Sequence, residues 1–242
     1  MIRRGQHPRG QRIVACQKKD PMIGQALVPL LLTLKVAGLA TLLTMVLGVA
    51  LAYGLARYAF WGREFLDAVC TLPLVMPPTV LGYYLIVLVG RRGWIGEWLY
   101  QKLGISLIFT WQGAVLASAV VAFPLVFKSA RAAFEGVDRQ LEGAARTLGA
   151  SEPGVFFRVT LPLAWRGIFA GTMLAFARGM GEFGATLMVA GNIPGRTQTL
   201  SLAVYDAVEA GRDDLANFLV LVASSVCVAI LLGSGRLLRP RY

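Results

Sequence analysis

Long apolar runs without charged residues dominate the chain, and they arrive in blocks rather than at the spacing of a surface helix. Four such runs cover residues 36–56, 68–90, 103–127 and 215–235. Each meets the roughly 20 residues that an α-helix needs to cross a bilayer core of about 30 Å. The pattern therefore predicts an all-α, polytopic membrane protein.

A fifth apolar stretch is interrupted by charge. Residues 167–177 are apolar, Arg178 to Glu182 breaks the run, and residues 183–191 resume it. Charged side chains inside a membrane are tolerated where they face protein or water, so we count this stretch as an interrupted span. We expect five transmembrane helices in a single domain covering residues 22–242, with spans near 27–56, 66–90, 105–128, 164–190 and 215–235.

Basic residues are divided unequally between the two sides of this topology. One side carries eleven lysines and arginines, in the loops after the first and third spans and at the C-terminus, and the other side carries five. The positive-inside rule therefore predicts a cytoplasmic C-terminus and an N-terminus outside. The net charge of +11 is explained by this orientation and does not indicate nucleic-acid binding.

The first 21 residues conflict with this orientation, because six basic residues there would make the two sides equal. We expect translation to begin at Met22, with residues 1–21 a non-native or mis-assigned extension. A lipoprotein signal is the alternative, but the segment lacks the apolar stretch that such signals need. The three cysteines lie apart and His7 is the sole histidine, so we expect neither a disulfide framework nor a metal site.

A charged segment between the third and fourth spans has the pattern of two helices. Apolar residues recur every three or four positions, at Ala130, Phe134, Val137, Leu141, Ala144, Ala145 and Leu148. Gly149 would end this helix, and Ser151 to Pro153 would begin a second one that ends before Pro162. We predict a helix-turn-helix on the cytoplasmic surface over residues 130–162. A solvated linker, or a helix resting on lipid headgroups, is the alternative.

The motif "GAARTLGASEPGVFFRVTLP" at residues 143–162 resembles the EAA loop of ABC importer permeases. Gly143 occupies the family's glutamate position, with Glu142 one place earlier, and Val159 replaces isoleucine. In that family the loop inserts into a separate ATPase subunit and transmits its movement to the membrane helices. The resemblance assigns this ATPase-coupling role to Glu142, Gly143, Ala144, Ala145, Arg146, Thr147, Leu148, Gly149, Val159, Leu161 and Pro162.

Two further segments resemble the molybdate branch of the same family: "LPLVMPPTVLGYYLIVLVGRRGWIGEWL" at 72–99 and "FARGMGEFGATLMVAGNIPGRTQTL" at 176–200. The resemblance implies a type I ABC importer permease fold in a bacterial inner membrane and transport of molybdate or tungstate. It also implies a homodimer, two ATPase subunits and an extracytoplasmic molybdate-binding protein that meets outer loops such as residues 192–199. Sulfate is the alternative substrate, because sulfate permeases share the GEFGA element.

The chain has no G-x-x-x-x-G-K-[ST] phosphate loop, so we expect ATP and Mg²⁺ to be bound by the partner subunit. The sequence shows neither a nucleophile with a base nor a set of metal ligands, so it does not suggest an enzyme. A self-sufficient channel or carrier and a non-transporting membrane scaffold remain alternatives of other classes. Lipid is an expected partner in each case, and nucleic acid is not.

The interruptions of the second and fourth spans predict a translocation pathway or gate. Prolines at 73, 77 and 78 lack the backbone N–H and so leave carbonyl groups without a donor. At membrane depth such carbonyls are tolerated only beside protein or a water-filled cavity. Arg178 and Glu182 lie one helical turn apart, and their pairing could be structural or could border the pathway. Glycines beside them could form a helix interface or a hinge. The candidate pathway residues are Pro77, Pro78, Arg178, Gly181, Glu182 and Gly184.

Overall fold

A computed structural model describes residues 22–238 of the 242-residue chain, and within that part every regular element is a helix. The proposed extension at 1–21 lies outside the described residues. The elements are α1 (Met22–Arg57), α2 (Arg63–Val75), α3 (Pro78–Val89), α4 (Trp94–Leu103), α5 (Trp111–Glu135), α6 (Arg139–Thr147), α7 (Glu152–Val155), the π-helix η1 (Phe156–Thr160), α8 (Leu161–Met180), α9 (Gly184–Ala190), α10 (Leu200–Glu209) and α11 (Asp213–Leu238).

Four helical stretches among the described residues are long and apolar enough to cross a membrane. A fifth span results if the bent pair α2 and α3 is counted as one, which agrees with the five spans expected from the sequence. The four straight candidates are Ile23–Arg57, Trp111–Glu135, Glu152–Met180 and Asp213–Gly233.

The second expected span, residues 66–90, is not one continuous helix. α2 and α3 meet at an angle of 117°, with Pro77 and Pro78 at the break. Two successive residues without an N–H cannot continue the i to i−4 ladder, and the residue before a proline is disfavoured in α conformation, so Met76 is extended. Pro73, which we also expected to disrupt this span, stays inside α2.

The centre of the fold is a bundle of α1, α5 and α8, which pack against one another along much of their length. Small residues allow the close approach of α5 and α8. A Cβ atom on Gly167 would lie 2.6 Å from the Cβ of Ala133, and one on Gly171 would lie 2.4 Å from the Cβ of Ser129. These glycines form a G-x-x-x-G pattern of the kind that brings membrane helices into backbone contact.

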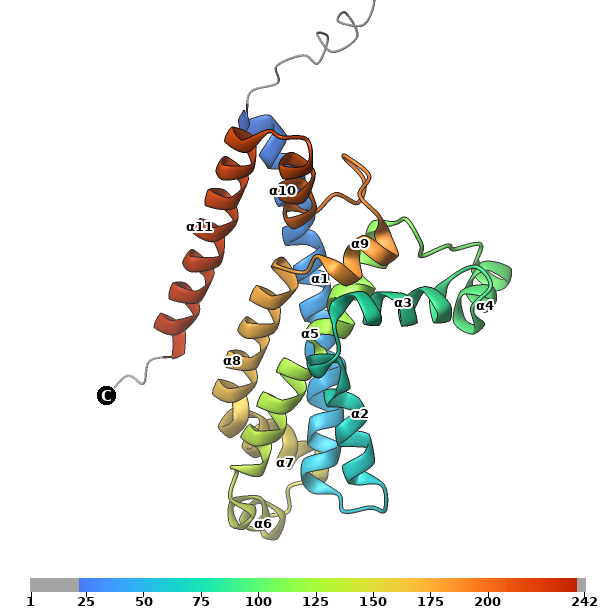
Figure 1. Cartoon of the computed structure of the whole chain (residues 1–242). Coiled ribbons are helices and arrows are strands. Elements are labelled where there is room, and N and C mark those ends of the chain that lie inside the picture. Colours follow the sequence, from blue (N-terminus) through green and yellow to red (C-terminus); the bar gives the residue numbers. More distant parts are fainter. Residues whose placement is uncertain (1–21, 239–242) are drawn as a thin grey trace, which may run out of the picture.

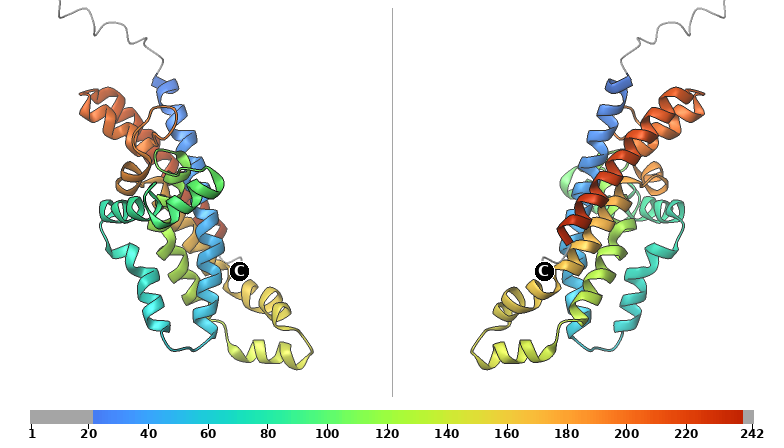
Figure 2. Two further views of the ribbon diagram at one scale, coloured as in Figure 1. Left: turned by 90° about the vertical axis from the view of Figure 1, so that its right-hand side faces the viewer. Right: turned by 90° about the vertical axis from the view of Figure 1, so that its left-hand side faces the viewer.

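The remaining helices are arranged around this bundle at two opposite ends. The start of α1, α10 and the α10–α11 turn lie at one end, called the α10 end here (Figure 1). The α1–α2 turn and α6 lie at the other, called the α6 end, where α6 runs crosswise below the bundle (Figure 2). α3 and α4 project sideways from the bundle between the two ends (Figure 1).

Candidate functional site

α6 ends in the way that the sequence predicts, through a left-handed glycine. Gly149 has φ of +85°. Its N–H donates to the carbonyl of Arg146 at 2.9 Å, and the N–H of Ala150 donates to the carbonyl of Ala145 at 3.1 Å. These two bonds form a Schellman motif, which satisfies the last carbonyls of the helix. A Cβ on Gly149 would meet nothing within 4 Å, so the backbone alone requires glycine there.

The apolar face predicted for residues 130–148 is divided between two helices. Phe134 and Val137 are buried in the core, but the chain breaks at Gly136 to Asp138 and turns into α6. The leucines of this helix and its cap point outward: Leu141 in α6 is 49% exposed, and Leu148, which directly follows α6, is 88% exposed. The predicted single helix is therefore wrong, and α6 presents leucines to its surroundings at the extremity of the fold.

The second helix of the loop begins at Glu152 as expected but does not end before Pro162. α7, η1 and α8 form one uninterrupted helix from Glu152 to Met180. Proline inside a helix normally clashes with the carbonyl four residues earlier. The π-helical turn directly before α8 is wider and changes this register, which gives a physical reason for the continuity. The loop is thus joined rigidly to the fourth span.

Glu142 is buried, although the sequence pattern placed it on the polar face of its helix. Glu142 is 3% exposed, and its carboxylate accepts hydrogen bonds from Arg57 and Thr160. Arg146, which lies one turn from Glu142, pairs instead with Glu152 through two hydrogen bonds of 2.7 and 3.1 Å. These bonds raise the pKa of the Arg146 guanidinium.

The other expected coupling residues lie along the same exposed edge or in the helix that follows. Exposed residues are Ala144, Arg146, Thr147, Leu148, Gly149 and Pro162, and partly buried residues are Gly143, Ala145, Val159 and Leu161. Sequence reasoning missed Arg57 and Thr160, which contact Glu142. Arg57 was interpreted only as a charge that sets orientation, because its partner lies 85 positions away.

The two helix breaks that we assigned to a pathway lie against each other. A Cβ on Gly184, at the start of α9, would be 3.2 Å from the Cβ of Pro78, at the start of α3. One turn further along α3, a Cβ on Gly82 would be 2.7 Å from the Cβ of Met188. α3 and α9 therefore pack closely, and the break between α2 and α3 adjoins the break between α8 and α9.

Arg178 and Glu182 form an ion pair of 2.7 Å, as their spacing suggests. Glu182 is 2% exposed, and its second oxygen accepts a hydrogen bond from the backbone N–H of Ala185 at 2.9 Å. The carboxylate therefore caps the first turn of α9. The Arg178 side chain is 36% exposed, and Gly181 is exposed with an ordinary negative φ of −89°.

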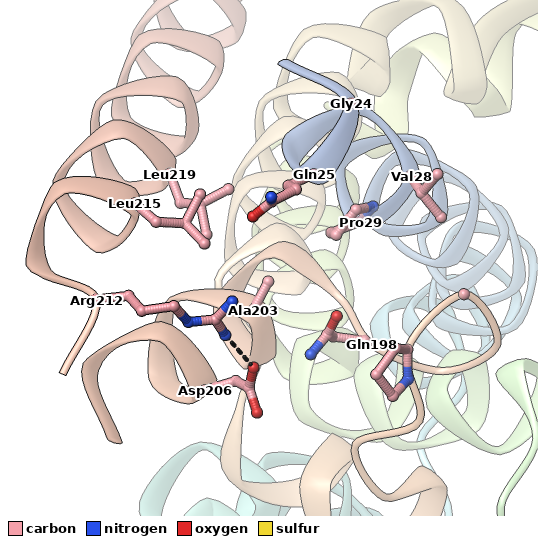
Figure 3. A pocket seen from close by; sticks show the side chains of 12 residues that line it. Gly24, Gln25, Val28, Pro29, Gln198, Ala203, Asp206, Arg212, Leu215 and Leu219 are labelled. Atoms are coloured by element: carbon pink, nitrogen blue, oxygen red, sulfur yellow. Dashed lines mark hydrogen bonds and ion pairs between the residues drawn. The ribbon is translucent and has the colours of Figure 1, made fainter. Parts of the chain in front are cut away.

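The α10 end contains a pocket of about 350 Å³ between α1, α10 and α11 (Figure 3). Gln25 and Gln198 line it, together with Asp206 and Arg212, which pair at 2.9 Å (Figure 3). The neighbouring segment 192–199, which we expected to be exposed, is exposed only at Pro194 to Arg196.

Residues 197–199 of that segment are buried, because the chain here closes onto its own turn and onto α1. Thr197, Gln198 and Thr199 are each at most 9% exposed. The hydroxyl of Thr197 accepts a hydrogen bond from Ile193 N–H at 3.0 Å, which closes the turn. The hydroxyl of Thr33 accepts one from Leu200 N–H at 2.7 Å, so a side chain of α1 caps α10.

The described residues form a polytopic helical bundle with two adjoining broken helices and a crosswise helix, and this is a fold found in ABC transporters. One chain of the inward-facing MetNI methionine ABC transporter has this fold, with a TM-score of 0.70 over 91% of this chain and 97% of that chain. Its sequence identity is only 17%, so the likeness concerns the fold alone.

The chain belongs to the family of binding-protein-dependent transport system inner membrane components, whose family model matches residues 44–242. The molybdenum transport system permease protein ModB of Escherichia coli is 49% identical over 215 residues, which cover 87% of this chain and 94% of that protein. A probable sulfate transport system permease protein of Chlorella vulgaris is 38% identical, over 74% of this chain and 67% of that protein.

Proposed function

We propose that this chain is the membrane-spanning subunit of an importer that moves molybdate into the cytoplasm, driven by ATP hydrolysed on a partner subunit. The similarity to ModB carries the proposal, because it extends over nearly the whole of both proteins at 49% identity. Tungstate, which has nearly the same size and charge, would use the same route. Sulfate is the second candidate, and the lower identity and coverage of the sulfate relative favour it less.

The proposed assembly is a homodimer with two ATPase subunits that bind ATP and Mg²⁺, and an extracytoplasmic molybdate-binding protein. The α6 end lies in the cytoplasm with the C-terminus, and the N-terminus lies outside, as the distribution of basic residues indicates. ATP binding would draw the two ATPase subunits and their docked loops together and open the paired permeases outward. Hydrolysis would return them to the inward-facing state.

The exposed leucines of α6 support its role as the docking element. Leu148 is 88% exposed at the extremity of the fold, which is costly in water and favourable in a groove of another protein. The helix leads through Gly149 directly into the continuous helix that begins at Glu152. Force applied to the loop by a partner would therefore reach the fourth span.

The adjoining breaks at Pro77 and Pro78 and at Gly181 to Gly184 support a pathway or gate at this level of the membrane. Substrate sites of transporters are typically formed where membrane helices are discontinuous. The structural role of Glu182 as the cap of α9 makes it a support for such a gate. Arg178, which is more exposed, is the residue of the pair that would border the pathway.

Uptake of labelled molybdate tests the proposal. Cells that lack this chain should regain uptake when it is resupplied together with its ATPase and binding protein, and a large excess of sulfate should compete poorly. Full competition by sulfate would assign the protein to the second candidate. Uptake without an ATPase subunit would instead indicate a self-sufficient carrier, and no transport at all in liposomes would leave only a scaffold.

Substitution of Gly149 by valine should reduce uptake by about tenfold, because a β-branched residue at positive φ costs roughly 1–2 kcal/mol and would disrupt the end of α6. Gly62 offers a matched control, since its φ is +97°, no atom lies within 4 Å of its Cβ position, and it lies in the α1–α2 turn outside the loop. Gly62→Val should leave uptake close to wild type when the two variants are expressed at equal levels. Equal uptake by both variants would count against a coupling role for the loop that contains Gly149.

A further inference from the structure

α6 is attached to the rest of the protein by one exposed ion pair, between Arg146 and Glu152, and by one buried polar residue, Glu142. Within α6, all of which is described, Glu142 is the one buried residue. Most surface helices are held by an apolar stripe, but the leucines of α6 face outward. The chain on each side of the helix contains a glycine, at Gly136 and Gly149. Without Glu142, α6 would be held only by its two short connections and by the exposed pair of Arg146 with Glu152.

The Glu142 carboxylate binds two other elements at once. Its Oε1 accepts a hydrogen bond from Nη2 of Arg57 at 2.6 Å and another from the hydroxyl of Thr160 at 2.6 Å. Arg57 is the last residue of α1, and Thr160 is the last residue of η1, directly before α8. One oxygen atom therefore joins the coupling helix to the ends of two long helices.

The surroundings of this junction exclude water. The side chains of Arg57 and Glu142 are 9% and 4% exposed, and Thr160 is fully buried. Nearby, the ring of Tyr53 packs on Phe134 and Phe156, with centroids 5.4 and 4.6 Å away. A charge pair in such surroundings is weakly screened, and losing one partner leaves a buried charge unpaired.

We propose that Arg57, Glu142 and Thr160 form the joint that makes α6, α1 and α8 move as one rigid body. The inference rests on the proposed coupling function and adds how the movement of α6 reaches the first span. In the sequence, the end of α1 at Arg57 and the start of α6 at Arg139 are 82 positions apart. α1 packs along both α5 and α8, so displacement of its end is passed to the whole bundle. The three residues are positioning residues, which act by fixing the place of α6.

The test compares ATP hydrolysis with uptake in the full complex of permease, ATPase and binding protein, reconstituted in liposomes with molybdate as the substrate. Arg57→Gln and Glu142→Gln complexes should still retain the ATPase subunit and hydrolyse ATP, while molybdate imported per ATP falls about tenfold. Arg57→Lys keeps a cation and N–H donors, so its ratio should stay within about threefold of wild type.

Arg63→Gln is the matched control, since Arg63 also pairs with a glutamate at the same end of the fold, at 2.9 Å, but this glutamate, Glu135, belongs to α5 and not to α6. The molybdate imported per ATP hydrolysed by this variant should equal that of the wild type. Thr160→Val serves if the glutamine variants do not fold, because it preserves the shape and the charge pair and removes one hydrogen bond. It should lower the ratio severalfold.

The proposed joint would be overturned if molybdate imported per ATP were unchanged in the Arg57→Gln, Glu142→Gln and Thr160→Val complexes. It would also be overturned if Arg63→Gln lowered this ratio equally, or if the variants lost ATP hydrolysis, ATPase retention and uptake in parallel. Failure of the proposed function gives a different result, because the wild-type complex itself would then import no molybdate.

Discussion

Replacing Leu148 with aspartate should abolish capture of the ATPase subunit and, with it, molybdate uptake, while the permease still folds. Leu148 is 88% exposed and contributes nothing to the core, so the variant should have normal stability. In a docked complex, burial of this side chain would contribute roughly 1.5–3 kcal/mol, and a carboxylate in the same place would add a desolvation cost. We expect binding to weaken about 100-fold or more.

Co-purification of the two subunits in detergent measures this effect. Leu103→Asp is the control, because Leu103 is an exposed leucine, at 58%, on α4 and far from α6 in the fold. The control variant should retain its ATPase subunit. If both variants retain it equally, α6 is not the docking element.

The second large effect is expected at Gly171, where an added methyl group should separate α5 from α8. Its Cβ would lie 2.4 Å from the Cβ of Ser129 and 3.0 Å from the carbonyl oxygen of Leu125, and neither atom can move without its backbone. Overpacking of this kind costs about 1–3 kcal/mol. The melting temperature in detergent should fall by about 2–4 °C for each kcal/mol.

Gly38→Ala is the comparison for Gly171→Ala, since it also lies in a long helix but has no atom within 4 Å of its Cβ position. Alanine is a better helix former than glycine by about 1 kcal/mol, so this variant should melt at or above the wild-type temperature. Thermal unfolding followed by size-exclusion chromatography separates the two results. Equal melting temperatures would mean that α5 and α8 are not in the close contact described.

The sequence predicted those features that depend on residues close together in the chain. Gly149 ends α6 with a positive φ, and charge interrupts the fourth span near Gly181 to Gly184, because both are local effects of glycine and of broken periodicity. Pro77 and Pro78 predicted a disturbed second span, but not the 117° angle. That angle depends on the packing of α3 on α9, which lies about a hundred residues later.

Features that depend on residues far apart in the chain could not be predicted from the sequence pattern. Helical periodicity placed Glu142 on the same polar face as Arg139 and Arg146, which are indeed exposed, yet the structure buries Glu142. Its burial depends on Arg57 and Thr160, and no local sequence pattern connects Glu142 with Arg57. The continuity of the helix through Pro162 was missed for a related reason, because the π-helical turn of Phe156–Thr160 has no sequence signal of its own.

The bend between α2 and α3 also constrains how the chain is inserted during its synthesis. With 13 and 12 residues, these helices are each only about 20 Å long, so neither can cross the bilayer unaided. α3 packs on α5 and on α9, so its packing is complete only after Gly184 to Ala190 have been translated. We therefore expect the final placement of the α3–α4 arm to be a late event of folding, after the earlier helices have been inserted.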